Sequence, residues 1–215
     1  MKNEKKLIIR TALLCLIPMF IGLALWRRLP DSIPTHFGLD GTPNGWSSKP
    51  AAVFGLPLFM LAMHLLCVFA AAYDPKNRNL SRRINVLILW IAPLTSLLVL
   101  GSVYASALGA EIDMGRSVMC FIGVLFVIVG NYLPKCRQNY TVGIKLPWTL
   151  ADEDNWNRTH RLAGVLWIAG GLMILAAGLL GRGSLSYVLF VAAIVLMTAV
   201  PTAYSFTLYR RKSRD

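Results

Sequence analysis

Residues 131–164 read NYLPKCRQNYTVGIKLPWTLADEDNWNRTHRLAG, a polar stretch in a chain that is otherwise mostly apolar. The stretch holds two tryptophans, one histidine and five basic residues. The whole chain of 215 residues is 56% hydrophobic and only 15% charged, which is more apolar than the core of one soluble domain of this size requires. The stretch is therefore best interpreted as a loop between two membrane helices of an integral membrane protein.

The rest of the chain divides into long apolar runs. A helix needs about 20 apolar residues to cross a hydrocarbon core of roughly 30 Å. Six runs are long enough: residues 7–26, 51–73, 84–108, 117–133, 162–180 and 185–208. We predict an all-α integral membrane protein with six transmembrane helices.

The basic residues are distributed unevenly between the predicted loops. If the N-terminus is cytoplasmic, 17 of the 22 Lys and Arg fall in cytoplasmic segments, at residues 1–10, 74–83, 134–161 and 210–214. Such an excess is typical of cytoplasmic loops. The pattern predicts a multi-pass protein of the cell membrane with both termini in the cytoplasm. It also accounts for the net charge of +12 without direct nucleic-acid binding.

The predicted outer loop, residues 27–50, is rich in proline and glycine. Proline fixes φ and glycine permits positive φ, so we expect a compact, ordered, hairpin-like loop. Its turns are expected near Asp40-Gly41 and Asn44-Gly45, and the loop has room for a short pair of strands.

Four side chains of this outer loop are candidates for contact with an extracellular ligand: His36, Asp40, Trp46 and Lys49. His36 with Asp31 or Asp40 also offers a metal or proton site, but no spacing here is diagnostic of a metal. A tryptophan in the position of Trp46 is more often an anchor at the membrane interface than a binding platform. The four cysteines of the chain show no spacing typical of zinc sites.

The predicted inner loop, residues 134–161, begins with a helix breaker. Pro134 should end the fourth membrane helix, and a glycine and a second proline interrupt the segment that follows. Thr149 then starts a capping pattern, because its hydroxyl can accept from a backbone N–H three residues on. We predict that a helix begins at Thr149 and continues through His160 into the fifth span.

A spacing of four residues places Trp156, His160 and Gly164 along one face of that helix. His160 is a functional candidate, because a histidine at a membrane surface can titrate near neutral pH. Structural roles compete with functional ones here. Trp148 and Trp156 also suit the aromatic belt of a membrane protein, and Arg161 suits contact with lipid phosphate.

Two features lie inside the predicted spans. The fifth span carries Gly164, Gly171 and Gly178, each preceded by alanine or glycine, and this repeat permits close helix approach in a static or a sliding interface. His64 lies near the middle of the second span. An ionisable side chain at such depth is a functional candidate, and a neutral imidazole bonded to a nearby hydroxyl is the structural alternative.

Two segments of the sequence resemble a known family. Residues 139–149, NYTVGIKLPWT, are followed by Trp156 and by the triplet Thr159-His160-Arg161, and this pattern resembles the SdpI family of bacterial membrane immunity and signalling proteins. The outer loop is similar to the small membrane domain of unknown function that usually precedes the SdpI region. Lys145 stands where family members commonly carry arginine, so the charge is kept and the bidentate guanidinium fork is lost.

The resemblance implies an organisation and a function. It implies an N-terminal membrane domain at residues 1–83 and an SdpI-like membrane domain at residues 84–215. The type member of the family protects its producer from a secreted peptide toxin and recruits a cytosolic winged-helix repressor. By this resemblance the inner loop is a partner or signalling surface, and its expected residues are Asn139, Gly143, Lys145, Pro147, Trp148, Thr149, Trp156, Thr159, His160 and Arg161. No catalytic residue, cofactor or metal is expected.

Two other functions stay open at this point. A membrane enzyme or metal-dependent hydrolase would use His36, His64 or His160, although no serine or cysteine nucleophile with a paired base is visible in the sequence. A transporter of small solutes or protons would be built around His64.

Overall fold

The computed structural model describes residues 2–38, 41–76, 81–181 and 183–213. In this part of the chain, six helical segments are long and apolar enough to cross a membrane: Glu4–Ala24, Ala51–Ala72, Arg82–Ala107, Met114–Lys135, Glu153–Leu180 and Ser184–Lys212. The six apolar runs are thus confirmed as helices. The fifth helix begins nine residues before its apolar run at residue 162, as expected for a helix that starts in the inner loop.

The chain forms two compact units. Unit 1 comprises Met1–Ala72 and Asn85–Gly115, and unit 2 comprises Tyr73–Ile84 and Arg116–Asp215. The domain boundary expected between residues 83 and 84 comes from the family resemblance and not from the packing of the chain, so the two compact units do not test it.

Unit 1 contains the first three membrane-compatible segments. The first consists of α1 (Lys2–Cys15) and α2 (Ile17–Ala24), which are separate helices because Pro18 lacks the N–H that would continue the ladder. The second begins with a π-helical turn, Ala51–Gly55, and continues as α3 (Leu56–Ala72). The third is α4 (Arg82–Ala107).

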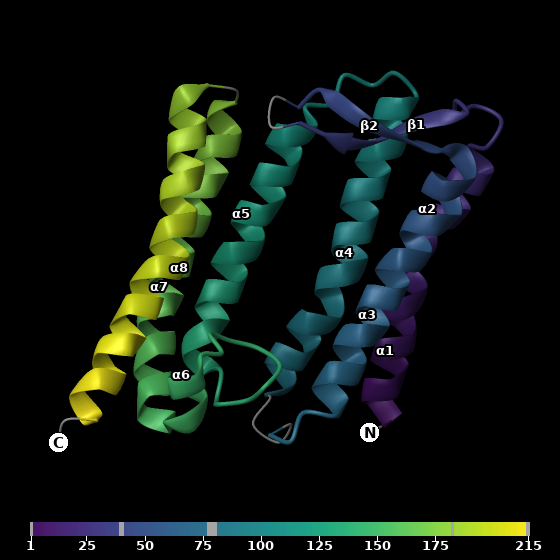
Figure 1. The fold of residues 1–215 in the computed structure, drawn as a ribbon. Coiled ribbons are helices and arrows are strands. Elements are labelled where there is room, and N and C mark those ends of the chain that lie inside the picture. The colour runs from purple at the N-terminus through teal and green to yellow at the C-terminus, as the bar shows by residue number, and fades with distance from the viewer. Residues whose placement is uncertain (1, 39–40, 77–80, 182, 214–215) are drawn as a thin grey trace. The chain divides into compact units, whose positions relative to one another are not determined.

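The outer loop folds into two antiparallel strands, β1 (Ser32–Phe37) and β2 (Pro43–Ser48), which lie across one end of the helices of unit 1 (Figure 1). The loop, in which the sequence left room for a short pair of strands, thus contains one in the structure. The turn expected at Asn44-Gly45 is wrong, because both residues lie inside β2, with Gly45 opposite His36. A side chain at Gly45 would bring its Cβ to 2.9 Å from the His36 Cβ, so the glycine permits close strand contact there.

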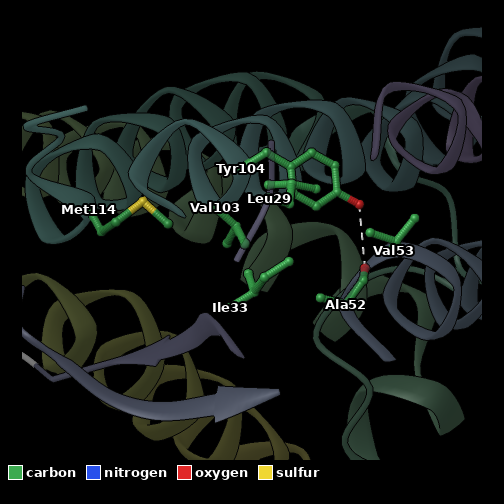
Figure 2. Packing of buried hydrophobic residues seen from close by; sticks show 7 residues of the cluster. All are labelled: Leu29, Ile33, Ala52, Val53, Val103, Tyr104 and Met114. Atoms are coloured by element: carbon green, nitrogen blue, oxygen red, sulfur yellow. Dashed lines mark hydrogen bonds between the residues drawn. The ribbon is translucent and has the colours of Figure 1, made fainter. Parts of the chain in front are cut away.

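One face of this hairpin packs into the core of unit 1. Ile33 of β1 is fully buried, and it belongs to a cluster with Leu29, Ala52, Val53, Val103, Tyr104 and Met114 (Figure 2). The Tyr104 hydroxyl donates to the Ala52 carbonyl at 3.4 Å (Figure 2). Burying the Ile33 side chain contributes roughly 2 kcal/mol, which ties the hairpin to the helix ends.

Unit 2 is built from α5 (Met114–Tyr132), α7 (Glu153–Leu180) and α8 (Ser184–Lys212), seen side by side in Figure 1. A Cβ on Gly171 of α7 would lie 2.7 Å from the carbonyl oxygen of Gly123 on α5. A Cβ on Gly170 would lie 2.4 Å from the Met197 sulfur on α8. The small residues predicted to permit close approach therefore do so on two faces of α7.

Candidate functional site

The inner loop runs between α5 and α7 and is held by buried side chains. The α5 helix ends at Tyr132, followed by the short 3-10 turn Leu133–Lys135, as Pro134 predicts. Asn139 is fully buried in the loop. Its Oδ1 accepts from the backbone N–H groups of Thr141 at 2.9 Å and Val142 at 2.7 Å. Its Nδ2 donates to the Arg137 carbonyl at 2.8 Å and to the Cys136 sulfur at 3.2 Å.

His160 joins the loop to α7 through both ring nitrogens. Nδ1 lies 2.8 Å from the Trp156 carbonyl oxygen and donates to it, and Nε2 accepts from the Ile144 N–H at 2.9 Å. An Nε2 that accepts carries no proton, so the buried imidazole is neutral in this arrangement. The His160 ring also stacks on Trp156, with ring centroids 4.0 Å apart. The two residues share one helix face, as their spacing predicts.

Trp156 and Gly143 complete this packing. The Trp156 indole N–H donates to the Cys136 carbonyl at 2.8 Å. Gly143 has φ +126°, a backbone conformation that favours glycine. A Cβ at Gly143 would lie 2.4 Å from His160 Nε2 and 2.8 Å from the Trp156 ring. Both the backbone conformation and the packing therefore require glycine at this position.

Thr149 does not start the long helix, which corrects the prediction. It lies within a separate short helix, α6 (Pro147–Ala151), where its hydroxyl accepts from the Leu146 N–H at 2.9 Å and donates to the Ile144 carbonyl at 2.8 Å. The N-cap of α7 is Asp152, whose carboxylate accepts from the Asp154 N–H at 3.0 Å. The reason is that Pro147 is favoured in the first turn of a helix and starts its own turn.

The loop is also fastened to α8. The Trp148 indole N–H donates to the Ser205 hydroxyl at 2.9 Å, and the buried Asn155 donates to the Ser205 carbonyl at 2.9 Å. Thr159 supports this contact, because its hydroxyl donates to Asn155 Oδ1 at 3.0 Å. The sequence interpretation did not include Asn155 or Ser205. Ser205 lies about 50 residues away in an apolar run, where no local pattern marks a loop contact.

Eight of the ten predicted loop residues separate into a buried and an exposed group, and Gly143 and Trp148 are half-buried. Asn139, Thr149, Trp156, Thr159 and His160 are buried, and they fix the shape of the loop. Lys145, Pro147 and Arg161 are exposed. The Lys145 ammonium donates to the carbonyls of Tyr140 at 3.1 Å and Thr141 at 3.2 Å, so the loop backbone positions it.

Asp74, which was not among the predicted residues, contacts the inner loop from the segment after α3. Asp74 is 7% exposed, and its carboxylate accepts from the Tyr140 N–H at 2.8 Å, the Thr141 hydroxyl at 2.6 Å and the Lys76 N–H at 2.8 Å. Burial acts to raise the pKa of Asp74, but these hydrogen bonds outweigh it and hold the pKa below its ordinary value. Sequence patterns miss this contact because more than 60 residues separate the partners.

Replacing Asp74 by alanine should therefore destabilise the protein in a pH-dependent way. The loss is expected to be about 1–3 kcal/mol near pH 7, because a depressed carboxyl pKa contributes stability above the unfolded-state pKa. That contribution disappears as pH falls below the ordinary value of 3.8 and through the lowered native pKa. Thermal unfolding of both proteins in detergent at pH 7 and pH 3 measures the effect, and an equal difference at both values would contradict it.

The outer candidates lie on or next to the hairpin of unit 1. Lys49 forms a salt bridge to Asp31 at 3.0 Å and lies 5.5 Å from the centroid of the Trp26 ring, and only 13% of its side chain is exposed. His36 contacts the Asn44 side chain across the strands. Trp46 is 58% exposed, and Asp40 lies outside the described residues. Among the described candidates, Trp46 is the one that offers an exposed aromatic side chain to a ligand.

His64 is buried inside unit 1. Its Nε2 lies 3.1 Å from the Thr11 hydroxyl, so the hydroxyl partner expected for a neutral imidazole is Thr11. Its Nδ1 has no hydrogen-bond partner among the described residues. Within the same described residues, no group of three or more His, Cys, Asp or Glu side chains could hold a metal ion.

Comparisons with known proteins agree with the resemblance seen in the sequence. The SdpI/YfhL protein family matches residues 135–205, which include the inner loop, and a domain of unknown function (DUF1648) matches residues 13–61, which include the hairpin. Immunity protein SdpI of Bacillus subtilis (strain 168) is 26% identical over 211 residues, covering 96% of this chain and 97% of that protein. No solved structure matches the chain. Residues 135–205 are therefore similar to the SdpI/YfhL protein family, and residues 13–61 are similar to DUF1648.

Proposed function

We propose that this protein is a non-enzymatic immunity protein of the cell membrane, which protects its host against a secreted antimicrobial peptide toxin. The observation that carries the proposal is the similarity to Immunity protein SdpI, which extends over 96% of this chain and 97% of that protein. The similarity thus includes both the hairpin and the inner loop. Six membrane-compatible helices in the described residues agree with a multi-pass protein.

The proposed orientation has both termini in the cytoplasm. It is supported by the excess of Lys and Arg in residues 1–10, 74–83, 134–161 and 210–214. In this orientation the hairpin faces the outside, where a secreted peptide arrives. The inner loop then faces the cytoplasm, where it would bind a partner protein and not the toxin.

Contact with the toxin is proposed for the outer hairpin, with Trp46 as its main apolar contact. Exposed tryptophans are frequent anchors of protein interfaces, and such a residue contributes roughly 2 kcal/mol or more when it is buried by a partner. The opposite face of the hairpin, at Ile33, is already occupied by the core of unit 1.

Replacing Trp46 by alanine should weaken protection without loss of protein. We expect at least about a tenfold lower toxin concentration for half-maximal killing, because the lost contact is worth about 2 kcal/mol. The survival curve of a sensitive host measures this effect. Trp46→Phe serves as the control and should retain most of the protection, and full protection by Trp46→Ala at equal membrane levels would contradict the role.

A cytosolic winged-helix repressor is the proposed partner of the inner loop. The support is the exposed, basic part of the loop, with Lys145 and Arg161, held on a buried framework that includes His160. Charged rim residues of this kind steer association and confer specificity more than they add affinity.

The role of Arg161 in partner binding can be tested without destabilising the protein, because its side chain is exposed. Arg161→Ala should reduce the membrane-bound fraction of a tagged winged-helix repressor of the same host by about fivefold to tenfold, which corresponds to roughly 1 kcal/mol. Arg158→Ala is the matched control, since Arg158 is an exposed arginine of the same helix that pairs with Asp154 at 3.6 Å. Equal recruitment by the wild type and Arg161→Ala would remove Arg161 from the partner surface.

A further inference from the structure

Residues 73–76, which follow α3, contact the inner loop. They belong to unit 2, although α3 itself belongs to unit 1. Asp74 accepts from the Tyr140 N–H, the Thr141 hydroxyl and the Lys76 N–H. Lys76 in turn donates to the Gln138 side chain, and its ammonium lies 5.7 Å from the centroid of the Tyr140 ring. Two neighbouring side chains thus hold one short stretch of the loop.

The residues held by Asp74 position the exposed part of the loop. The Tyr140 N–H and the Thr141 hydroxyl donate to Asp74, and the backbone carbonyls of the same two residues accept from the Lys145 ammonium. Gln138 donates to the carbonyls of Thr149 and Leu150, both at 2.9 Å, in the short helix α6. A displacement of Asp74 would therefore remove a support of Lys145, whereas α6 is held through Gln138 and Lys76.

The chemistry of a buried carboxylate suits a contact that opens and closes. Taking a carboxylate out of water costs free energy that its hydrogen bonds return with only a small surplus, so a hydrated open state lies no more than a few kcal/mol above the closed state. Asp74 follows α3 by one residue, Tyr73, so an axial shift or a rotation of α3 moves the carboxylate relative to the loop. A packed element with two arrangements of similar energy is what a conformational relay requires.

We propose that Asp74 is a releasable clamp on the inner loop. In the closed arrangement it holds Tyr140 and Thr141 and so positions Lys145; when the end of α3 moves, the carboxylate becomes hydrated and the loop opens. This proposal rests on the proposed function in one respect: the surface that the clamp switches between two states is the proposed partner surface. Asp74 is thus a positioning residue for that surface.

Cys136 provides a direct reporter of loop opening. Its side chain is 3% exposed and its sulfur accepts from Asn139 inside the loop. The experiment uses the full-length protein in lipid nanodiscs, with alanine in place of Cys15, Cys67 and Cys120, and measures the rate of Cys136 modification by N-ethylmaleimide. Asp74→Asn should increase this rate about tenfold or more while the helical circular dichroism signal stays unchanged.

Conservative variants separate a clamp from general destabilisation. Thr141→Val removes the hydroxyl that Asp74 binds and should also speed labelling, whereas Thr141→Ser keeps the hydroxyl and should label at the wild-type rate. The double variant Asp74→Asn/Thr141→Val should label no faster than Asp74→Asn alone. Asp154→Asn is the matched control, because Asp154 is an exposed acid of unit 2 that pairs with Arg158 on α7, and its replacement should leave the rate unchanged.

Two results would overturn the clamp: a wild-type labelling rate in Asp74→Asn, or an equal increase in Asp154→Asn. If Asp74→Asn does not fold, the comparison of Thr141→Val with Thr141→Ser decides the question, and equal rates in those two variants would overturn the clamp. The experiment requires neither toxin nor repressor. Its failure therefore counts against the clamp alone, whereas failure of the immunity function appears only in survival of the host.

Discussion

Gly143→Ala should lower the stability of the protein by about 3 kcal/mol or more, the sum of backbone strain and overpacking. The backbone of Gly143 has φ +126°, which L-residues with a side chain rarely adopt. Its new Cβ would also lie 2.4 Å from His160 Nε2, the atom that accepts from the Ile144 N–H. Relief of the clash therefore requires His160 to move, and the hydrogen bond from the Ile144 N–H to its Nε2 would be lost.

Thermal unfolding in detergent micelles measures this loss, and Gly109→Ala is the matched control. Gly109 also has positive φ, +89°, but a Cβ there meets nothing within 4 Å. The control should cost only the backbone strain, about 1–2 kcal/mol. If the two substitutions lowered the unfolding temperature equally, the packing of Gly143 against His160 and Trp156 would be wrong.

Gly171→Ala should have the second large effect, a loss of about 2–3 kcal/mol from overpacking. The added Cβ would lie 2.7 Å from the Gly123 carbonyl oxygen and 2.8 Å from the Val127 backbone nitrogen. Both are backbone atoms of α5, so no side-chain rotation relieves the contact. The helices must separate instead, and packing at small residues is what holds membrane helices together.

Gly101→Ala in α4 gives the opposite expectation. A Cβ at Gly101 meets nothing within 4 Å, so the substitution should be neutral or stabilising by up to about 1 kcal/mol, because alanine favours helix over glycine. The unfolding temperatures of the two variants measure the difference. Equal shifts would show that α5 and α7 do not approach each other at Gly171.

Local patterns in the sequence predicted the elements well. Runs of about 20 apolar residues located the six helices, and the proline and glycine content of residues 27–50 predicted an ordered hairpin. The spacing of Trp156 and His160 also predicted their shared helix face, because the period of a helix is fixed.

The errors and omissions arose where two local options compete or where distant residues meet. Asn44-Gly45 suits a turn, but pairing with β1 incorporates it into β2. Thr149 suits an N-cap, but Pro147 begins a separate turn before it. The contacts of Asp74 with Thr141 and of Ser205 with Trp148 join residues more than 50 positions apart, which no local period reveals.

The division of the loop into buried and exposed residues bears on function. His160 has both ring nitrogens in hydrogen bonds within the protein, so its contacts favour a structural role. The buried residues hold a surface in place, and exposed residues such as Lys145 and Arg161 are the ones that a partner can reach.

The most direct test of the immunity function is survival of a sensitive host. A Bacillus subtilis strain 168 derivative that lacks SdpI would be challenged with the secreted peptide toxin to which it is then sensitive, while it expresses either this protein or an empty vector, with membrane levels measured by an epitope tag. Survival with the protein and killing with the empty vector are the predicted results. The same comparison would be made with the secreted peptides of the bacterium from which this protein comes. Equal killing of cells with the protein and cells with the empty vector in both challenges, with the protein present in the membrane, would contradict the account.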